Sequence, residues 1–231
     1  MARTTESERL KPKQQRSKQR VDSIVDAAKQ LLLEVGVEGV TTSAIAARAE
    51  VPIGSVYRYF ADVDDVIAAV IERTMKEIEH ATALAMLKLD TVTLRGILRI
   101  YTLTHLTYHQ ANPAFARVWF GGGFSLPVLE RAREADFRSV DRMMKAAEAS
   151  GMVMDAGPDH GPRLIMRLGS RTLEYVFTEP LSAADQKSLV LEYVEMASDY
   201  IDRYVNNAAR EGVPAERFIA GLAEWLGDEP A

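Results

Sequence analysis

The sequence predicts an all-α protein with a small helix-turn-helix domain near its N-terminus and a larger helical domain after it. Apolar residues recur every three or four positions through most of the 231 residues, and no stretch shows strand-like alternation. Gly and Pro fall between these periodic stretches, where helices end. We expect a flexible basic arm over 1–16, a DNA-binding domain over 17–63, and a helical effector-binding and dimerisation domain over 64–231.

Composition narrows the class of protein. Apolar residues make up 47% of the chain, which argues against disorder, and the absence of Cys excludes disulfides and thiolate sites. No apolar run reaches the roughly 18 residues of a membrane span, and the polar N-terminus does not resemble a secretory signal. We therefore expect a soluble, cytoplasmic protein. The net charge of −5 divides into +3 over 1–60 and −8 over the remainder, a distribution that orients the N-terminal part toward phosphate.

Local signals place the first four helices. Residues 1–16 lack apolar periodicity and contain Pro12, which is why we expect an arm there. A helix over 17–35 ends at Gly36, and a hydroxyl at Thr41 or Thr42 caps the next. Two short helices, about 42–49 and 53–60, then follow, and Asp62 caps a fourth that runs to about residue 87. Further helices are expected at about 91–110, 114–120, 127–150, 163–178, 182–210 and 214–226.

The two short helices close on one small core and leave polar and aromatic side chains outside. The core positions are Ile45, Ala46, Ala49, Val51, Val56 and Phe60. This stretch resembles the helix-turn-helix of the TetR family of transcriptional repressors. The matching residues are Thr42, Ile45, Ala46, Ala49, Val51, Gly54, Ser55, Val56, Tyr57, Tyr59 and Phe60.

The resemblance implies a set of DNA contacts. It places Ser43, Ile53, Gly54, Ser55 and Tyr57 near bases, and Thr42, Arg58 and Tyr59 near phosphates. The residue types agree, because Ile53 and the Tyr57 ring can contact thymine methyl groups and Arg58 can bind guanine. In the arm, Lys13, Arg16, Lys18 and Arg20 are expected to neutralise phosphates, although a solvated tail would have the same composition.

Three positions depart from the family pattern. Glu50 stands where the turn usually has Gly, and would be strained by about 1 kcal/mol if the backbone there is left-handed. Pro52 replaces a capping Ser, and Val63 replaces a Lys expected to contact phosphate.

The body carries an aromatic cluster that is a candidate effector site. Its members are Tyr101, His105, Tyr108, Phe115, Trp119, Phe120 and Phe124, with Met143 and Met166 as adaptable neighbours. For any single one of these residues ordinary core packing is the more common explanation, because pockets are few per protein. His105 and His109 have metal-ligand spacing, but no third ligand can be named, so we predict no metal and no cofactor. No nucleophile elbow, P-loop or dinucleotide motif supports an enzyme.

The resemblance also implies a homodimer, built from the helices at about 163–178 and 182–210. The sequence thus predicts a ligand-responsive DNA-binding regulator. It would be a repressor released from a palindromic operator in double-stranded DNA by a small apolar or amphipathic effector. The alternative is a helical small-molecule-binding protein whose DNA binding is weak or lost.

Overall fold

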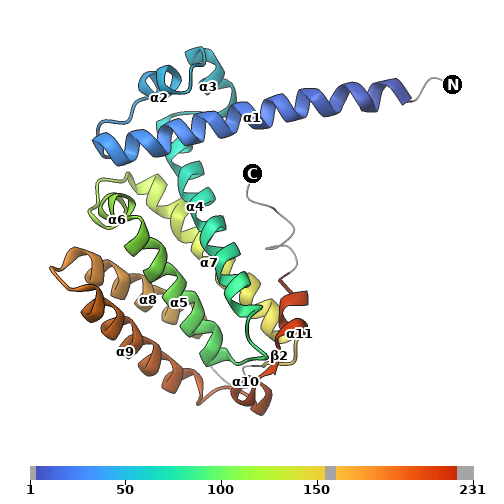
Figure 1. Cartoon of the computed structure of the whole chain (residues 1–231), viewed down its shortest axis with the longest axis vertical. Helices are drawn as coiled ribbons and strands as arrows, with labels where there is room; N and C mark the ends of the chain where they lie inside the picture. Colours follow the sequence, from blue (N-terminus) through green and yellow to red (C-terminus); the bar gives the residue numbers. More distant parts are fainter. Residues whose placement is uncertain (1–3, 154–159, 223–231) are drawn as a thin grey trace. The chain divides into compact units, whose positions relative to one another are not determined.

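The computed structural model describes residues 4–153 and 160–222, with side chains from residue 15 onward. It is all-helical apart from two paired strands of two residues each (Figure 1). The elements are α1 (Thr4–Val35), α2 (Thr42–Arg48), α3 (Ile53–Tyr59), α4 (Val63–Met86), β1 (Thr91–Val92), α5 (Leu94–Ala111), α6 (Pro113–Phe120), α7 (Leu126–Ala149), α8 (Gly161–Thr178), α9 (Ala183–Ile201), α10 (Asn207–Glu211), β2 (Val213–Pro214) and α11 (Ala215–Ala220).

The chain forms two compact units. The first contains residues up to Arg73 together with Gly123–Ala132, and the second contains Thr74–Gly122 and the chain from Arg133. Both α4 and α7 are therefore divided between the units. Among the described helices, none combines the length and the apolar character needed to cross a bilayer.

In the first unit, local signals set the ends of the short helices. Gly36 ends α1 with a φ of 72°, and the Thr41 hydroxyl caps α2 by accepting the Ala44 N–H at 3.2 Å. Pro52 precedes α3 without a side-chain cap. Ile45 of α2 and Val56 of α3 are both fully buried, so the two helices share a core as the sequence predicts.

The N-terminal arm differs from the prediction. Residues 4–16 are helical and continue into α1, which extends well past α2 and α3 in Figure 1. This segment is rich in Glu, Arg, Lys and Gln, which favour helix, and lengthening an existing helix avoids the unfavourable nucleation step. These two effects outweigh the helix-breaking tendency of Pro12, on which the predicted arm rests.

In the second unit, α9 packs against both α5 and α8. A large apolar core gathers residues from α4, α5, α7 and the C-terminal elements, with Phe218 and Met86 fully buried. Strand β1 pairs antiparallel with β2, with Val92 opposite Val213. The sequence predicted neither strand, because two residues are too few to show alternation.

Two predicted helices are shorter in the structure. The helix expected over 182–210 ends at Ile201, and α10 starts afresh at Asn207. Asn206 enforces the break, because its side chain caps α10 by accepting the Ala209 N–H at 2.9 Å and donates to the Gly151 carbonyl at 3.0 Å. The helix expected over 214–226 appears as α11, which ends at Ala220, and its predicted end lies outside the described residues.

Candidate DNA-binding surface and effector site

Helix α3 presents an unusual surface for a seven-residue helix. Ile53 and Tyr57, one turn apart, are 45% and 56% exposed, whereas Val56, next to Tyr57 in the chain, is fully buried. Gly54 and Arg58 are also exposed, and a side chain at Gly54 would meet no atom within 4 Å. Burying Ile and Tyr normally stabilises a fold, so their exposure together makes this face a candidate binding surface.

Polar groups border this face. Ser43 is exposed and Thr42 is half-buried at the start of α2, while Ser55 is half-buried on α3. The Ser17 hydroxyl donates to the Tyr59 hydroxyl at 3.1 Å, which fixes the Tyr59 ring and leaves its own proton free for another acceptor.

One cation of the first unit, Arg48, is held in an ion pair, whereas several others are exposed. Arg48 donates to both carboxylate oxygens of Glu34, at 2.8 and 2.6 Å, and this hydrogen-bonded pair lowers the pKa of Glu34. Arg58 lies 5.8 Å from the Tyr59 ring and remains exposed. Arg16, Lys18 and Arg20 of the predicted arm are likewise exposed or nearly so, while the Lys13 side chain lies outside the description.

The acidic run after α3 has a structural role, of which sequence reasoning found only the Asp62 cap. Asp62 caps α4 by accepting the Asp65 N–H at 2.9 Å, and Asp65 accepts the Ala61 N–H at 2.9 Å. The Ala61 N–H first and Arg131 second lower the pKa of Asp65. The Ser125 hydroxyl donates to Asp64 at 2.6 Å. Ser125 lies 61 residues after Asp64, and Arg131 lies 66 residues after Asp65, so no local sequence pattern could have predicted these contacts.

The comparisons agree with this geometry. Residues 24–70, which contain α2, α3 and the first part of α4, match the family model described as bacterial regulatory proteins of the tetR family. Residues 24–70 therefore form a DNA-binding domain of the tetR type. This confirms the resemblance on which the predicted helix-turn-helix rests.

Solved structures of several bacterial regulators share the fold. The fatty acid degradation regulator FadR from Bacillus halodurans is 20% identical, with a TM-score of 0.56, over 77% of this chain and 94% of that one. FadR from Bacillus subtilis in complex with stearoyl-CoA is 18% identical with a TM-score of 0.56, over 74% and 96%. A TetR-family regulator from Streptomyces coelicolor is 24% identical with a TM-score of 0.53, over 80% and 99%. No curated protein matches the sequence.

In the body, most of the predicted aromatic residues lie close together. His109 on α5 is surrounded by Phe115, Phe120 and Phe177, with ring centroids 5.9, 4.8 and 5.5 Å away. Sequence reasoning missed Phe177, near the end of α8. Its ring stacks on that of Phe120, with 5.2 Å between the ring centroids. Its position in an apolar helical stripe gave no sign of this contact.

The other predicted effector residues are placed around this group. Tyr101 lies 4.6 Å from His105, Tyr108 lies 6.2 Å from Phe115, and Trp119 stacks on Phe115 at 6.2 Å. Met143 and Met166 are buried in the large apolar core, against which Tyr101 packs. Phe124 belongs to the first compact unit.

The two histidines of α5 are buried without charge. Burial lowers the pKa of His105 to about 4, and burial together with the neighbouring His105 lowers that of His109 to about 3. Within the described residues, Nε2 of His105 and Nδ1 of His109 have no hydrogen-bond partner. The described part of the chain also contains no group of three potential ligands that could hold a metal ion.

Charged groups gather elsewhere in the body. Arg142 of α7 donates to the buried Glu79 of α4 at 2.7 Å. Burial raises the pKa of Asp136 to about 7, with Glu79 adding to the shift and Arg167 opposing it. Burial also raises the pKa of Tyr101, helped by the same two carboxylates. The interior thus offers both aromatic and ionisable groups.

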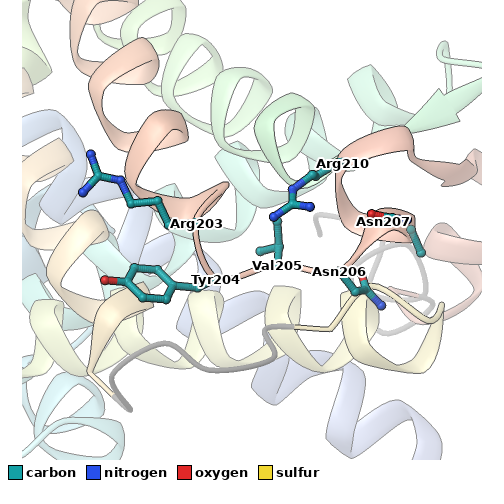
Figure 2. A pocket seen from close by; sticks show the side chains of 7 residues that line it. Arg203, Tyr204, Val205, Asn206, Asn207 and Arg210 are labelled. Carbon is teal, nitrogen blue, oxygen red and sulfur yellow. The ribbon is translucent and has the colours of Figure 1, made fainter.

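A hollow of about 640 Å³ lies at the junction of α9 and α10, away from the aromatic residues (Figure 2). Arg203 and Tyr204 line one side, and Asn207 and Arg210 the other. The Arg210 guanidinium donates twice to the Asp202 carbonyl, at 3.2 and 2.6 Å, so it serves the chain reversal after α9. We assign no ligand to this hollow.

Proposed function

We propose that the protein is a ligand-responsive transcriptional repressor that binds a palindromic operator as a homodimer. Two recognition helices α3 would enter successive major grooves, with half-sites about one turn or one and a half turns apart. The exposed row of Ile53, Tyr57 and Arg58 carries this proposal, because it combines thymine-methyl contacts with a cation for phosphate on one short helix.

The contacts proposed for each half-site follow from position and chemistry. Ser43, Ile53, Gly54, Ser55 and Tyr57 approach bases, while Thr42, Arg58 and Tyr59 approach phosphates. The exposed cations Arg16, Lys18 and Arg20, with Lys13, add sequence-independent attraction. Arg48 takes no part in this set, because both of its hydrogen-bonding nitrogens already face Glu34.

The apolar surface of the last two long helices supports the homodimer. On α8, Leu164, Leu168 and Tyr175 are 51%, 49% and 54% exposed, at spacings that put them on one side of the helix. On α9, Met196 is 65% exposed two turns after the exposed Leu189. We propose that α8 and α9 pack against the same helices of a second copy, which would cover this surface.

We further propose that a small apolar or amphipathic effector binds in the body and favours a spacing of the two DNA-binding units that does not fit the operator. Such a molecule would shift the population away from the DNA-bound form. The aromatic residues around His109 support an apolar site, and Bacillus subtilis FadR bound to stearoyl-CoA is a relative with an amphipathic ligand.

The test uses DNA from upstream of the protein's own gene in a gel-shift and fluorescence-anisotropy titration. We expect a shift that saturates at one dimer per operator and weakens steeply with salt. A flat titration with a folded dimer would instead favour a small-molecule-binding protein with weak or lost DNA binding. Stearoyl-CoA, added to the preformed complex, tests the acyl class of effector by whether it releases the DNA.

A further inference from the structure

Two buried ring nitrogens on α5, one in His105 and one in His109, have no role in the packing described so far. His105 and His109 stand one turn apart, are 8% and 3% exposed, and have ring centroids 6.4 Å apart. Each buries a ring nitrogen that has no hydrogen-bond partner among the described residues. A buried polar atom left without a partner destabilises a fold, and natural proteins pair nearly all such atoms. Two on one helix face therefore require a specific reason.

The walls around these nitrogens are made of uncharged rings. His105 is next to Tyr101, and His109 is next to Tyr108, Phe115, Phe120 and Phe177. The faces and edges of aromatic rings attract another ring in stacked or edge-to-face geometry. The carboxylates near the group act on its tyrosines: Glu77 accepts the Tyr108 hydroxyl at 2.9 Å, and Asp136 and Glu79 help to raise the pKa of Tyr101 beside His105.

We propose that His105 and His109 together bind the polar group of an uncharged aromatic effector that carries a hydroxyl. A neutral imidazole has one nitrogen that donates and one that accepts, and a hydroxyl satisfies either, whichever tautomer each ring adopts. This inference rests on the proposed effector site and deepens it, because it names the class of effector.

Two other interpretations of the pair are weaker. A metal ion would need a third ligand, and the described residues offer no such group. A purely structural role for both histidines would require a permanent partner for each nitrogen, so that replacing the ring by Phe would lower stability. If a ligand is the partner, the same replacement removes an unsatisfied atom and does not lower the stability of the free protein.

The experiment compares three probes of one shape on the free protein, in the absence of DNA, by calorimetric titration at pH 7. The probes are 2-naphthol, naphthalene and 2-naphthoate. We expect 2-naphthol to bind at least about tenfold more tightly than either of the others, the difference that one well-formed buried hydrogen bond makes. Equal binding of 2-naphthol and naphthalene, tighter binding of 2-naphthoate, or no binding of any probe would overturn the proposal.

Variants assign the preference to the pair. In His105→Phe and His109→Phe we expect 2-naphthol to fall to the affinity of naphthalene, with a melting temperature no lower than that of the native protein. His160→Phe, at the exposed residue before α8, is the matched control and should keep the preference. A preference that survives both replacements, or a melting temperature several degrees lower in both, would overturn the proposal.

The outcome is separable from that of the DNA-binding test. The probe titrations contain no DNA, so they stand even if no operator shift occurs. If stearoyl-CoA releases the operator while 2-naphthol does not bind, the proposed repressor remains and the aromatic class of effector is wrong.

Discussion

The two compact units differ in their buried polar groups. Both contain ion pairs, such as Asp26 with Arg73 at 2.6 Å in the first unit and Glu79 with Arg142 at 2.7 Å in the second. In the second unit lie all the buried side-chain nitrogens and oxygens that have no hydrogen-bond partner in the described chain. We infer that the first unit binds its partner through its surface, whereas the second unit binds a ligand in its interior.

In their exposed apolar side chains the two units are alike, because each leaves some of them uncovered. The first unit exposes Ile53 and Tyr57 on α3, and the second exposes Leu168 and Met196 on α8 and α9. These are departures from the usual division of apolar inside and polar outside, which local folding does not require. We infer that each uncovered group faces a molecule that the single chain does not include.

The largest expected effect comes from the apolar surface of the body. Leu168→Glu places a charge in the proposed dimer interface, and we expect a monomer by analytical ultracentrifugation. Operator affinity should fall by about two orders of magnitude or more, because a monomer engages one half-site at a time. Leu84→Glu, at a residue 43% exposed on α4, is the matched control. A Leu168→Glu protein that stays dimeric would show that this face is ordinary surface.

Substitutions on the exposed face of α3 are expected to have the next largest effect. Tyr57→Ala and Arg58→Ala each remove a contact twice per operator, so we expect at least about 100-fold weaker binding by anisotropy. Circular dichroism and the dimer should be unchanged, because both side chains are exposed. Arg99→Ala, at an exposed cation of α5, controls for loss of charge. Native affinity in either α3 variant would remove that residue from the contact set.

The accuracy of the sequence analysis differed between these two surfaces, for a physical reason. Helices α2 and α3 end within one residue of their predicted bounds, because Thr41 and Pro52 are local signals. The break after Ile201 was missed because it depends on Asn206 bonding to Gly151, 55 residues away. Phe177 and Ser125 were missed for the same reason, since their partners come from other helices.

The two buried histidines of the body predict that the free energy of unfolding falls in acid. In the unfolded chain a histidine has a pKa near 6.5, whereas His105 and His109 have values of about 4 and 3 when folded. Between these values the unfolded state binds more protons, so the free energy of unfolding falls as the pH falls below about 6.5. At pH 5 the expected loss, relative to pH 7, is about 2 kcal/mol per histidine.

Asp136 acts in the opposite direction and must be separated. Its pKa is raised to about 7, so its carboxyl stabilises the folded chain less as the pH rises from about 4 to 7, and acidification relieves this. Urea unfolding of the native protein and of the His105→Phe/His109→Phe variant, at pH 5 and pH 7, isolates the histidine contribution. If the two proteins have the same pH dependence, the histidines are not buried as neutral rings.

The smallest expected effect concerns the backbone of Glu50, in the turn between α2 and α3 of the first unit. Glu50 has a φ of 54°, the only positive value at a described residue other than glycine, which confirms the left-handed turn that the sequence raised as a condition. Glu50→Gly should therefore raise the free energy of unfolding by up to about 1 kcal/mol, because glycine adopts this backbone without strain. Ala47→Gly, at an exposed position inside α2, should lower it by about the same amount. Equal destabilisation by both changes would mean that the Glu50 side chain contributes more than its strained backbone loses, and that the turn between α2 and α3 departs from the family pattern because this chain gains from it.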